Sequence, residues 1–162
     1  GNVDTRLRKL GEGLFDAIVL ARAGLQRLGR ESEASAVLDV QRFVPAPGQG
    51  SLALQARAGD VATRGALAAV GDGGALACLL AERSLARALD ASCNTPLGAY
   101  GVMAEGKLHL RAWVGLPDGS AWIEDELSGD GGDPEVLGIA VGKRLLAAGA
   151  AEMLRRAERM AV

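Results

Sequence analysis

The sequence predicts an α/β segment followed by an α+β domain, in which a three-stranded antiparallel sheet packs against helices. Helical and strand-like patterns alternate over residues 1–30, which is typical of α/β folds. Further along, two helical patterns precede three strands whose apolar and polar residues alternate, and a last helical pattern follows them. We therefore expect two domains, at residues 1–58 and 59–162.

Three elements are expected in the first segment. A short helix runs through Leu10 with Asp4 or Thr5 as its cap, because these side chains can accept a hydrogen bond from a free backbone N–H. The apolar run at 16–21 has the composition of a buried parallel strand, and one or two helical turns follow at 23–28.

The sequence PAPGQG at 45–50 contains two prolines and two glycines, which exclude regular structure. It leads into a predicted strand at 51–57 and has the composition of a crossing between domains. Because glycine can also bring backbone amides close to a ligand, a hinge and a ligand-binding loop both stay open here.

The α+β domain is predicted from its periodicity and its turn residues. Leucine and alanine recur at spacings of three and four residues in the helices, and glycine-containing turns separate the strands. The last helix should begin with Asp133 as N-cap and Pro134 at its first position. The expected elements before it are helices at 60–69 and 74–90 and strands at 97–104, 108–114 and 121–127.

Composition argues against several classes of function. A net charge of −2 and only 3% aromatic residues disfavour nucleic-acid binding, which usually needs a basic or stacking surface. No apolar run reaches the roughly 20 residues that span a bilayer, and no signal-peptide pattern is present, so we expect a cytoplasmic chain with no membrane partner. The chain opens on Gly1 directly into a helical pattern, and we expect it to be a fragment.

Cys93 lies where the helical pattern at 74–90 gives way to a loop. Local context leaves two interpretations open, a solvent-accessible thiol that carries a group covalently or a small buried hydrophobe. Cys78, inside the helix, is expected to belong to the core. His109 is the single histidine and is expected on the wetter face of a strand without a role, so neither a metal site nor a Cys–His pair is indicated.

Six stretches occur in the order and at the spacing typical of one family. They are GNVDTRLRKL at 1–10, FDAIVLA at 15–21, AGLQRLG at 23–29, PAPGQG at 45–50, AER at 81–83 and CNTPLG at 93–98. Through them the chain resembles the C-terminal half of the porphobilinogen deaminases, also called hydroxymethylbilane synthases, over nearly its whole length.

The resemblance implies part of a transferase that joins four porphobilinogen molecules head to tail, with loss of ammonia, in tetrapyrrole biosynthesis. The units are added to a dipyrromethane cofactor held by a thioether. By motif position Cys93 is the cysteine that carries this cofactor, and the accessible-thiol interpretation is then preferred.

The same resemblance assigns further site residues. Arg6 and Arg27 match the arginines that bind the carboxylates of the cofactor, of porphobilinogen and of the oligopyrrole intermediates, a task suited to the planar guanidinium group. Gln49 is expected to line the same cleft, together with backbone groups of Ala21 and Gly24.

The first half of the family's sequence is absent, and with it the catalytic aspartate. The resemblance therefore implies that this chain is inactive alone and has the N-terminal half of the enzyme as its partner, in an intact enzyme that is a monomer. Residues 1–58 would be the remainder of a periplasmic-binding-protein-like domain plus a returning strand. Lacking sheet partners, that segment should pair with the missing half, pair with another copy, or become ordered only in the complete enzyme.

Two other functions stay open. A half-domain of periplasmic-binding type could bind a small anion through Arg6 and Arg27 without any chemistry. A purely structural or interaction domain would need neither these arginines nor Cys93.

Overall fold

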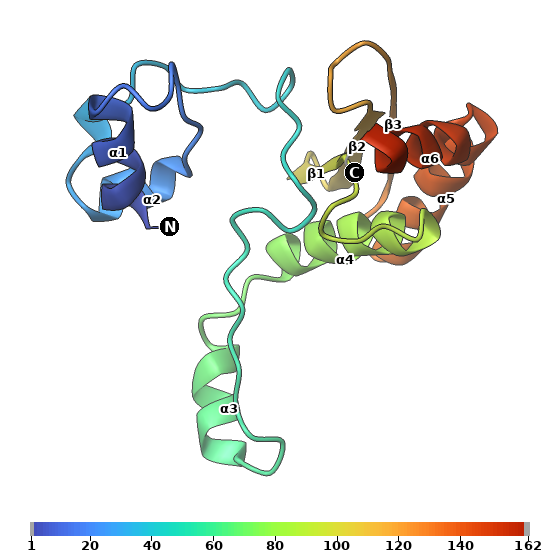
Figure 1. The fold of residues 1–162 in the computed structure, drawn as a ribbon. Helices are drawn as coiled ribbons and strands as arrows, with labels where there is room; N and C mark the ends of the chain where they lie inside the picture. Colours follow the sequence, from blue (N-terminus) through green and yellow to red (C-terminus); the bar gives the residue numbers. More distant parts are fainter. Residues whose placement is uncertain (1, 161–162) are drawn as a thin grey trace. The chain divides into compact units, whose positions relative to one another are not determined.

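The computed structural model describes residues 2–160. By their internal contacts the residues form two units, one ending at Asp39 and the other beginning at Val40 (Figure 1). The predicted domain boundary after residue 58 stays a prediction.

Short helices build the first unit. Helix α1 spans Val3–Gly11, helix α2 spans Arg22–Arg27, and a single 3-10 turn, η1, spans Glu31–Glu33. The two predicted helices are thus confirmed. Among the described residues of this unit, Leu25 alone is buried.

The N-cap of α1 is Asn2, and the prediction of Asp4 or Thr5 is wrong. The Asn2 side chain accepts a hydrogen bond from the Thr5 backbone N–H at 2.9 Å, and Asn2 has an extended backbone. A capping residue lies outside the helical conformation, whereas Asp4 is already in the first turn. There its negative charge faces the positive end of the helix dipole.

The strands predicted at 16–21 and 51–57 are wrong, because both segments contain neither helix nor strand. None of their side chains is buried, and Val19 is exposed by 72% and Leu52 by 74%. A strand needs a neighbour to satisfy its backbone hydrogen bonds, and the one sheet found within residues 2–160 is formed by later segments. The α/β pattern of the first segment therefore does not form a sheet within the described part of the chain.

The second unit contains every helix and strand that the sequence predicts after residue 59. Asp60 and Asp72 cap its first two helices by accepting hydrogen bonds from the Thr63 and Ala75 backbone N–H groups. The elements are α3 Val61–Ala68, α4 Gly73–Ala88, β1 Leu97–Ala104, β2 Lys107–Gly115, β3 Trp122–Asp130, α5 Pro134–Ala147 and α6 Ala150–Met160.

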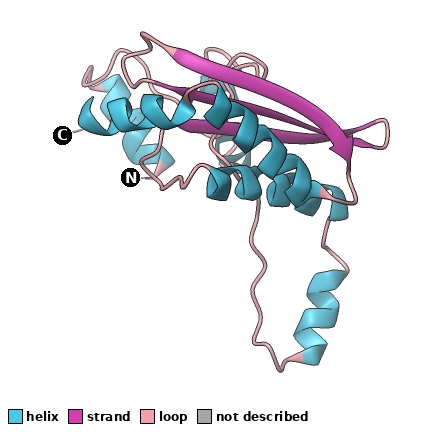
Figure 2. Ribbon diagram, turned by 90° about the vertical axis from the view of Figure 1, so that its right-hand side faces the viewer, coloured by secondary structure: helices cyan, strands magenta, loops and turns pink. Residues whose placement is uncertain are grey.

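The three strands form an antiparallel sheet in the order β1-β2-β3, with helices on one face (Figure 2). Alternate residues of β2 are buried against the helices, and His109 lies on the opposite, partly exposed face as predicted. The buried residues of β2 are Leu108, Leu110, Ala112 and Val114, and they pack with Leu85, Val141 and Leu145 of α4 and α5. This α+β arrangement is the one that the sequence predicts.

The end of the chain forms two helices, so the prediction of a single last helix is wrong. Asp133 is the N-cap of α5 and Pro134 its first residue, as expected. The helix ends at Ala147, and Gly149 just after it has a φ of +103°, which is incompatible with a continuing α-helix. Helix α6 then begins at Ala150, which is fully buried in the core.

Helices α4 and α5 meet backbone to backbone. A Cβ atom at Gly138 of α5 would lie 2.2 Å from the Ala81 carbonyl oxygen and 2.9 Å from the Leu85 nitrogen, both in α4. One turn later, a Cβ atom at Gly142 would lie 2.7 Å from the Cβ of Ala88. Two glycines therefore set how closely these helices approach.

Helix α3 differs from the other helices of this unit because none of its residues is buried. Within residues 2–160 no single helix has the length and apolar character needed to cross a membrane. Only α3 and α4 taken together pass that test, and they are bent by 97° at the break between them.

The close approach predicts that Gly138→Ala destabilises the fold. The added methyl group meets backbone atoms of α4 that cannot rotate away, so the free energy of unfolding should fall by about 2–3 kcal/mol. Urea denaturation followed by circular dichroism measures this loss. The matched control is Gly65→Ala in α3, where no atom lies within 4 Å; the free energy of unfolding should not fall there, and equal losses in the two variants would contradict the packing account.

Candidate functional site

Cys93 follows a helix end that is fixed by backbone hydrogen bonds. The Ala91 N–H donates to the Ala86 carbonyl at 2.9 Å, and the Asp90 N–H donates to the Arg87 carbonyl at 3.1 Å. Asp90 has a φ of +52°, the left-handed conformation that usually ends a helix in this hydrogen-bond pattern. The chain therefore leaves α4 in a defined direction just before Cys93.

The loop that contains Cys93 is closed by its own polar side chains. The Ser92 N–H donates to the Thr95 hydroxyl at 2.8 Å, and the Thr95 N–H donates to the Ser92 carbonyl at 3.1 Å. At the far end, the Pro96 carbonyl accepts a hydrogen bond from Gly115 of the sheet at 3.3 Å. The thiol-bearing residue thus lies in a short turn that is held at both ends.

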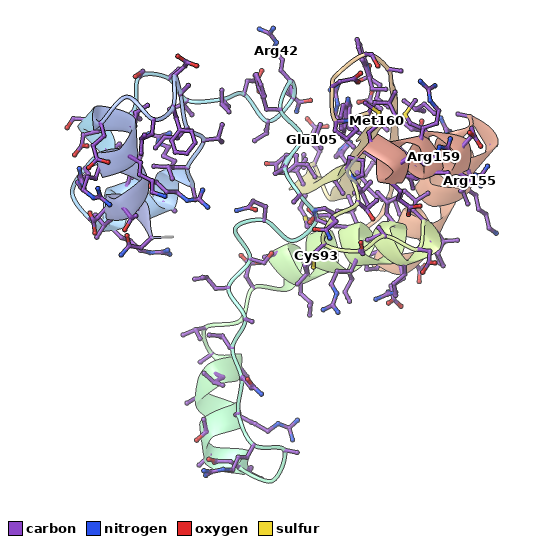
Figure 3. The ribbon with its side chains drawn as sticks, viewed as in Figure 1. Arg42, Cys93, Glu105, Arg155, Arg159 and Met160 are labelled. Carbon is purple, nitrogen blue, oxygen red and sulfur yellow. The ribbon has the colours of Figure 1, made fainter. Side chains whose placement is uncertain are left out.

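Cys93 itself is exposed and forms no disulfide (Figure 3). The interpretation of Cys93 as a small buried hydrophobe is therefore wrong. Its assignment as the cofactor cysteine stays a prediction, and the accessible sulfur is what that assignment requires.

Cys78 is the contrasting thiol. It is half-buried and packs against the hydrophobic core, as the sequence predicts. Burial raises the pKa of Cys78, and the negative charge of Glu82 one turn later adds to the effect. A thiol in this setting stays protonated and unreactive.

Glu82 is a buried carboxylate on the inner face of α4, exposed by only 7%. Its two oxygens accept hydrogen bonds from the backbone N–H groups of Gly48, at 2.6 Å, and Gly101, at 2.7 Å. Burial raises the pKa of Glu82, and this effect outweighs the opposite effect of the two hydrogen bonds. Sequence reasoning assigned Glu82 no role.

One sequence signal could have identified Glu82. It lies four residues after Cys78 and three before Leu85, so the helical period puts a charged residue among apolar ones. Its two hydrogen-bond partners could not have been found in this way, since they lie 34 and 19 residues away.

Gln49 lies exposed in the 45–50 loop, which folds as two consecutive turns. The Gln49 N–H donates to the Ala46 carbonyl at 2.9 Å, and the Ser51 N–H donates to the Gly48 carbonyl at 3.1 Å. The loop is also held to β1, because the Ala99 N–H donates to the Pro45 carbonyl at 2.8 Å.

Arg6 and Arg27 lie exposed in the first unit, and no carboxylate within residues 2–160 forms an ion pair with either of them. Other arginines of the unit are engaged. The engaged pairs are Arg8 with Glu12, Arg22 with Glu31, and Arg30 with both Asp4 and Glu33. The two arginines predicted to bind carboxylates are therefore available for an external anion.

Ala21 and Gly24 lie at the start of α2, where their backbone groups take part in the helix. The Gly24 N–H donates to the Ala21 carbonyl at 3.0 Å, and the Gly24 carbonyl accepts from Leu28 at 3.3 Å. Their role in lining a cleft stays a prediction. The predicted site residues thus fall into two groups, with Arg6, Ala21, Gly24 and Arg27 in the first unit and Gln49 and Cys93 in the second.

Comparison with known proteins covers most of the chain. Residues 1–65 match the family model described as porphobilinogen deaminase, dipyromethane cofactor binding domain. Residues 76–147, which include Cys93, match the model of the porphobilinogen deaminase C-terminal domain. The dipyrromethane cofactor expected from the sequence is thus the one named in the first description.

Curated relatives match over almost the same extent. A porphobilinogen deaminase of Thiobacillus denitrificans is 46% identical over 154 residues, which is 95% of this chain and 50% of that protein. Relatives of the same name from Acidithiobacillus ferrooxidans and Brevibacillus brevis are each 44% identical over 95% of this chain and 50% of their own length. The chain spans about half the length of these relatives, and it belongs to the porphobilinogen deaminase family.

Proposed function

We propose that this chain is the C-terminal part of a hydroxymethylbilane synthase. In that enzyme, four porphobilinogen molecules are condensed head to tail with loss of ammonia, and the chain's contribution is to hold the dipyrromethane cofactor and to bind carboxylates. The exposed sulfur of Cys93, in a turn fixed at both ends, is the observation that carries the proposal. Family membership supports it.

The residues around Cys93 fit a covalently held dipyrromethane. A thioether needs a sulfur that a bulky group can reach from solvent, and of the two thiols only Cys93 is exposed. When bound, the dipyrromethane supplies the pyrrole end to which the porphobilinogen units are joined. The role of this chain is to anchor that group while the helix end and the strand beside it stay in place.

Arg6 and Arg27 are proposed to bind acetate and propionate groups of the cofactor, the substrate and the growing oligopyrrole. Each pyrrole ring carries two carboxylates, and a guanidinium group pairs with a carboxylate through two parallel hydrogen bonds. The absence of an internal partner for both arginines within residues 2–160 supports this role. Gln49, Ala21 and Gly24 are proposed to line the same site.

The N-terminal half of the enzyme is the proposed partner. The segments 16–21 and 51–57 carry strand-forming sequences, yet none of their residues is buried or paired in a strand here. Strands supplied by the other half would satisfy their backbone groups and complete a periplasmic-binding-protein-like domain, of which residues 1–58 are the remainder. That half would also supply the catalytic aspartate, so this chain alone should be inactive; the intact enzyme is proposed to be a cytoplasmic monomer.

The alternative is a small-anion-binding module without chemistry. The two unpaired arginines would serve this function equally well, whereas the exposed Cys93 would have no part in it. Whether Cys93 carries a covalently bound group therefore distinguishes the two functions.

The first prediction concerns the mass of the polypeptide. When the chain is produced together with its N-terminal half, Cys93 should carry the extra mass of two pyrrole units, and acidic dimethylaminobenzaldehyde should give a pink colour. Cys93→Ser should abolish both signals, because no other exposed thiol is present within residues 2–160. Cys78→Ala is the matched control and should keep the adduct; an unmodified Cys93 in active enzyme would refute the proposal.

The second prediction concerns substrate binding. In the enzyme containing this chain, Arg6→Gln and Arg27→Gln should each raise the KM for porphobilinogen by roughly ten- to a hundredfold, the usual effect of losing a charge-assisted hydrogen bond. Steady-state kinetics measures the change. Arg8→Gln is the control. Because Arg8 is already paired with Glu12, this substitution should leave the KM for porphobilinogen unchanged. An equal rise in all three variants would point to a general effect of charge.

A further inference from the structure

We propose that Glu82 is a positioning residue that fixes the 45–50 loop, and with it Gln49, to the helix and strand on either side of the Cys93 turn. This inference rests on the proposed function, because Gln49 and Cys93 are site residues only within it. The argument depends on three features: the burial of Glu82, the nature of its two partners, and the place of those partners in the chain.

Burying a carboxylate at position 82 costs desolvation free energy. A side chain that only filled space there would not need to carry a charge. Taking a charge out of water is unfavourable unless hydrogen bonds compensate, and an apolar side chain of similar size would pack there without this penalty. No cationic side chain within residues 2–160 forms an ion pair with Glu82. The compensation comes from two backbone N–H groups, which are oriented donors and therefore impose a geometry on their segments.

The first partner belongs to the 45–50 loop, whose own hydrogen bonds form two turns and no helix or strand. Gly48 and Gly50 have φ angles of +75° and +85°, and two prolines interrupt the same six residues. Within residues 2–160, Glu82 provides the one side-chain hydrogen bond that this loop receives. The side chain of Leu79 lies against Gly48 from the same helix, since its Cδ1 would be 3.1 Å from a Cβ there.

The second partner connects Glu82 with the Cys93 turn. Gly101 is in β1, the strand that begins at Leu97 directly after that turn, and Glu82 itself is in α4, the helix that leads into it. One carboxylate therefore bonds to the strand that leaves the turn and to the Gln49 loop, while its own helix enters the turn. Through Glu82, the loop of Gln49 and the turn of Cys93 are thereby connected to the same helix and strand within the second unit.

Removing the carboxylate should release the loop before it affects the sheet. Gly101 is also held by strand pairing with Leu110, whereas Gly48 has no ladder to support it. In Glu82→Gln the amide keeps one acceptor oxygen, but its NH2 group faces a second N–H donor and cannot accept from it. The Gly48 N–H is consequently the bond that should be lost.

The test is amide hydrogen exchange at Gly48 in the chain itself, measured by NMR. Glu82→Gln should accelerate exchange at Gly48 by roughly ten- to a hundredfold, because a hydrogen bond to a charged group is lost, while Leu110 of β2 keeps its protection as evidence of an intact fold. Glu158→Gln is the matched control, an exposed glutamate whose change should leave Gly48 unaffected. Unchanged protection of Gly48 in Glu82→Gln would overturn the proposal.

A second measurement separates positioning from mere stability. In the enzyme containing this chain, Glu82→Gln should raise the KM for porphobilinogen several-fold more than it lowers kcat, with the Cys93 adduct mass retained. A fall in kcat with unchanged KM, or a loss of the adduct, would overturn the positioning role. Failure of the proposed function would give a different result, namely Cys93 without an adduct in the unsubstituted chain. The faster exchange of Gly48 in Glu82→Gln would still be observed in that case.

Discussion

The contact between helices α4 and α5 at Gly138 determines where the proposed site residues of the second unit lie. Because the two backbones touch there, α4 can neither slide nor rotate without a clash at Ala81 or Leu85. The same helix presents Leu85 to the sheet, directs Glu82 toward two backbone donors, and ends just before Cys93. The buried contact at Gly138 thus also fixes the position of the exposed Cys93.

Ion pairs within the chain, and not an excess of positive charge, decide which arginines stay available to a ligand. The net charge is −2, which is unfavourable for holding a polyanionic ligand. Half of the six basic side chains of the first unit are neutralised locally, and among them Arg30 bridges Asp4 and Glu33. Arg6 and Arg27 lack such partners within residues 2–160, so an acidic protein still offers guanidinium groups to carboxylates. Glu82 is the reverse case, a buried anion whose hydrogen-bond partners within residues 2–160 are two backbone N–H groups.

The sequence predicts most of the second unit because its signals are local. Asp133 at a helix start, proline at 134 and alternation along β2 each specify an element without reference to distant residues. The strands at 16–21 and 51–57 failed for the opposite reason, since strand formation depends on a partner that local pattern does not reveal. Cys93 was ambiguous, because a loop after a helix suits both a buried and an exposed thiol, and Glu82 was missed because its partners are remote in sequence.

The two units also differ in how far each can support its own geometry. The second has a continuous core, whereas the first buries Leu25 alone among its described residues. Burying one leucine contributes about 2 kcal/mol, which is comparable with the entropy cost of ordering only one or two residues. Within its own unit the geometry of Arg6 and Arg27 thus rests on few buried contacts, whereas Cys93 follows a helix that belongs to the continuous core. The two tasks proposed for this chain, anchoring the cofactor at Cys93 and binding carboxylates through Arg6 and Arg27, therefore fall in units that differ in the size of their buried core.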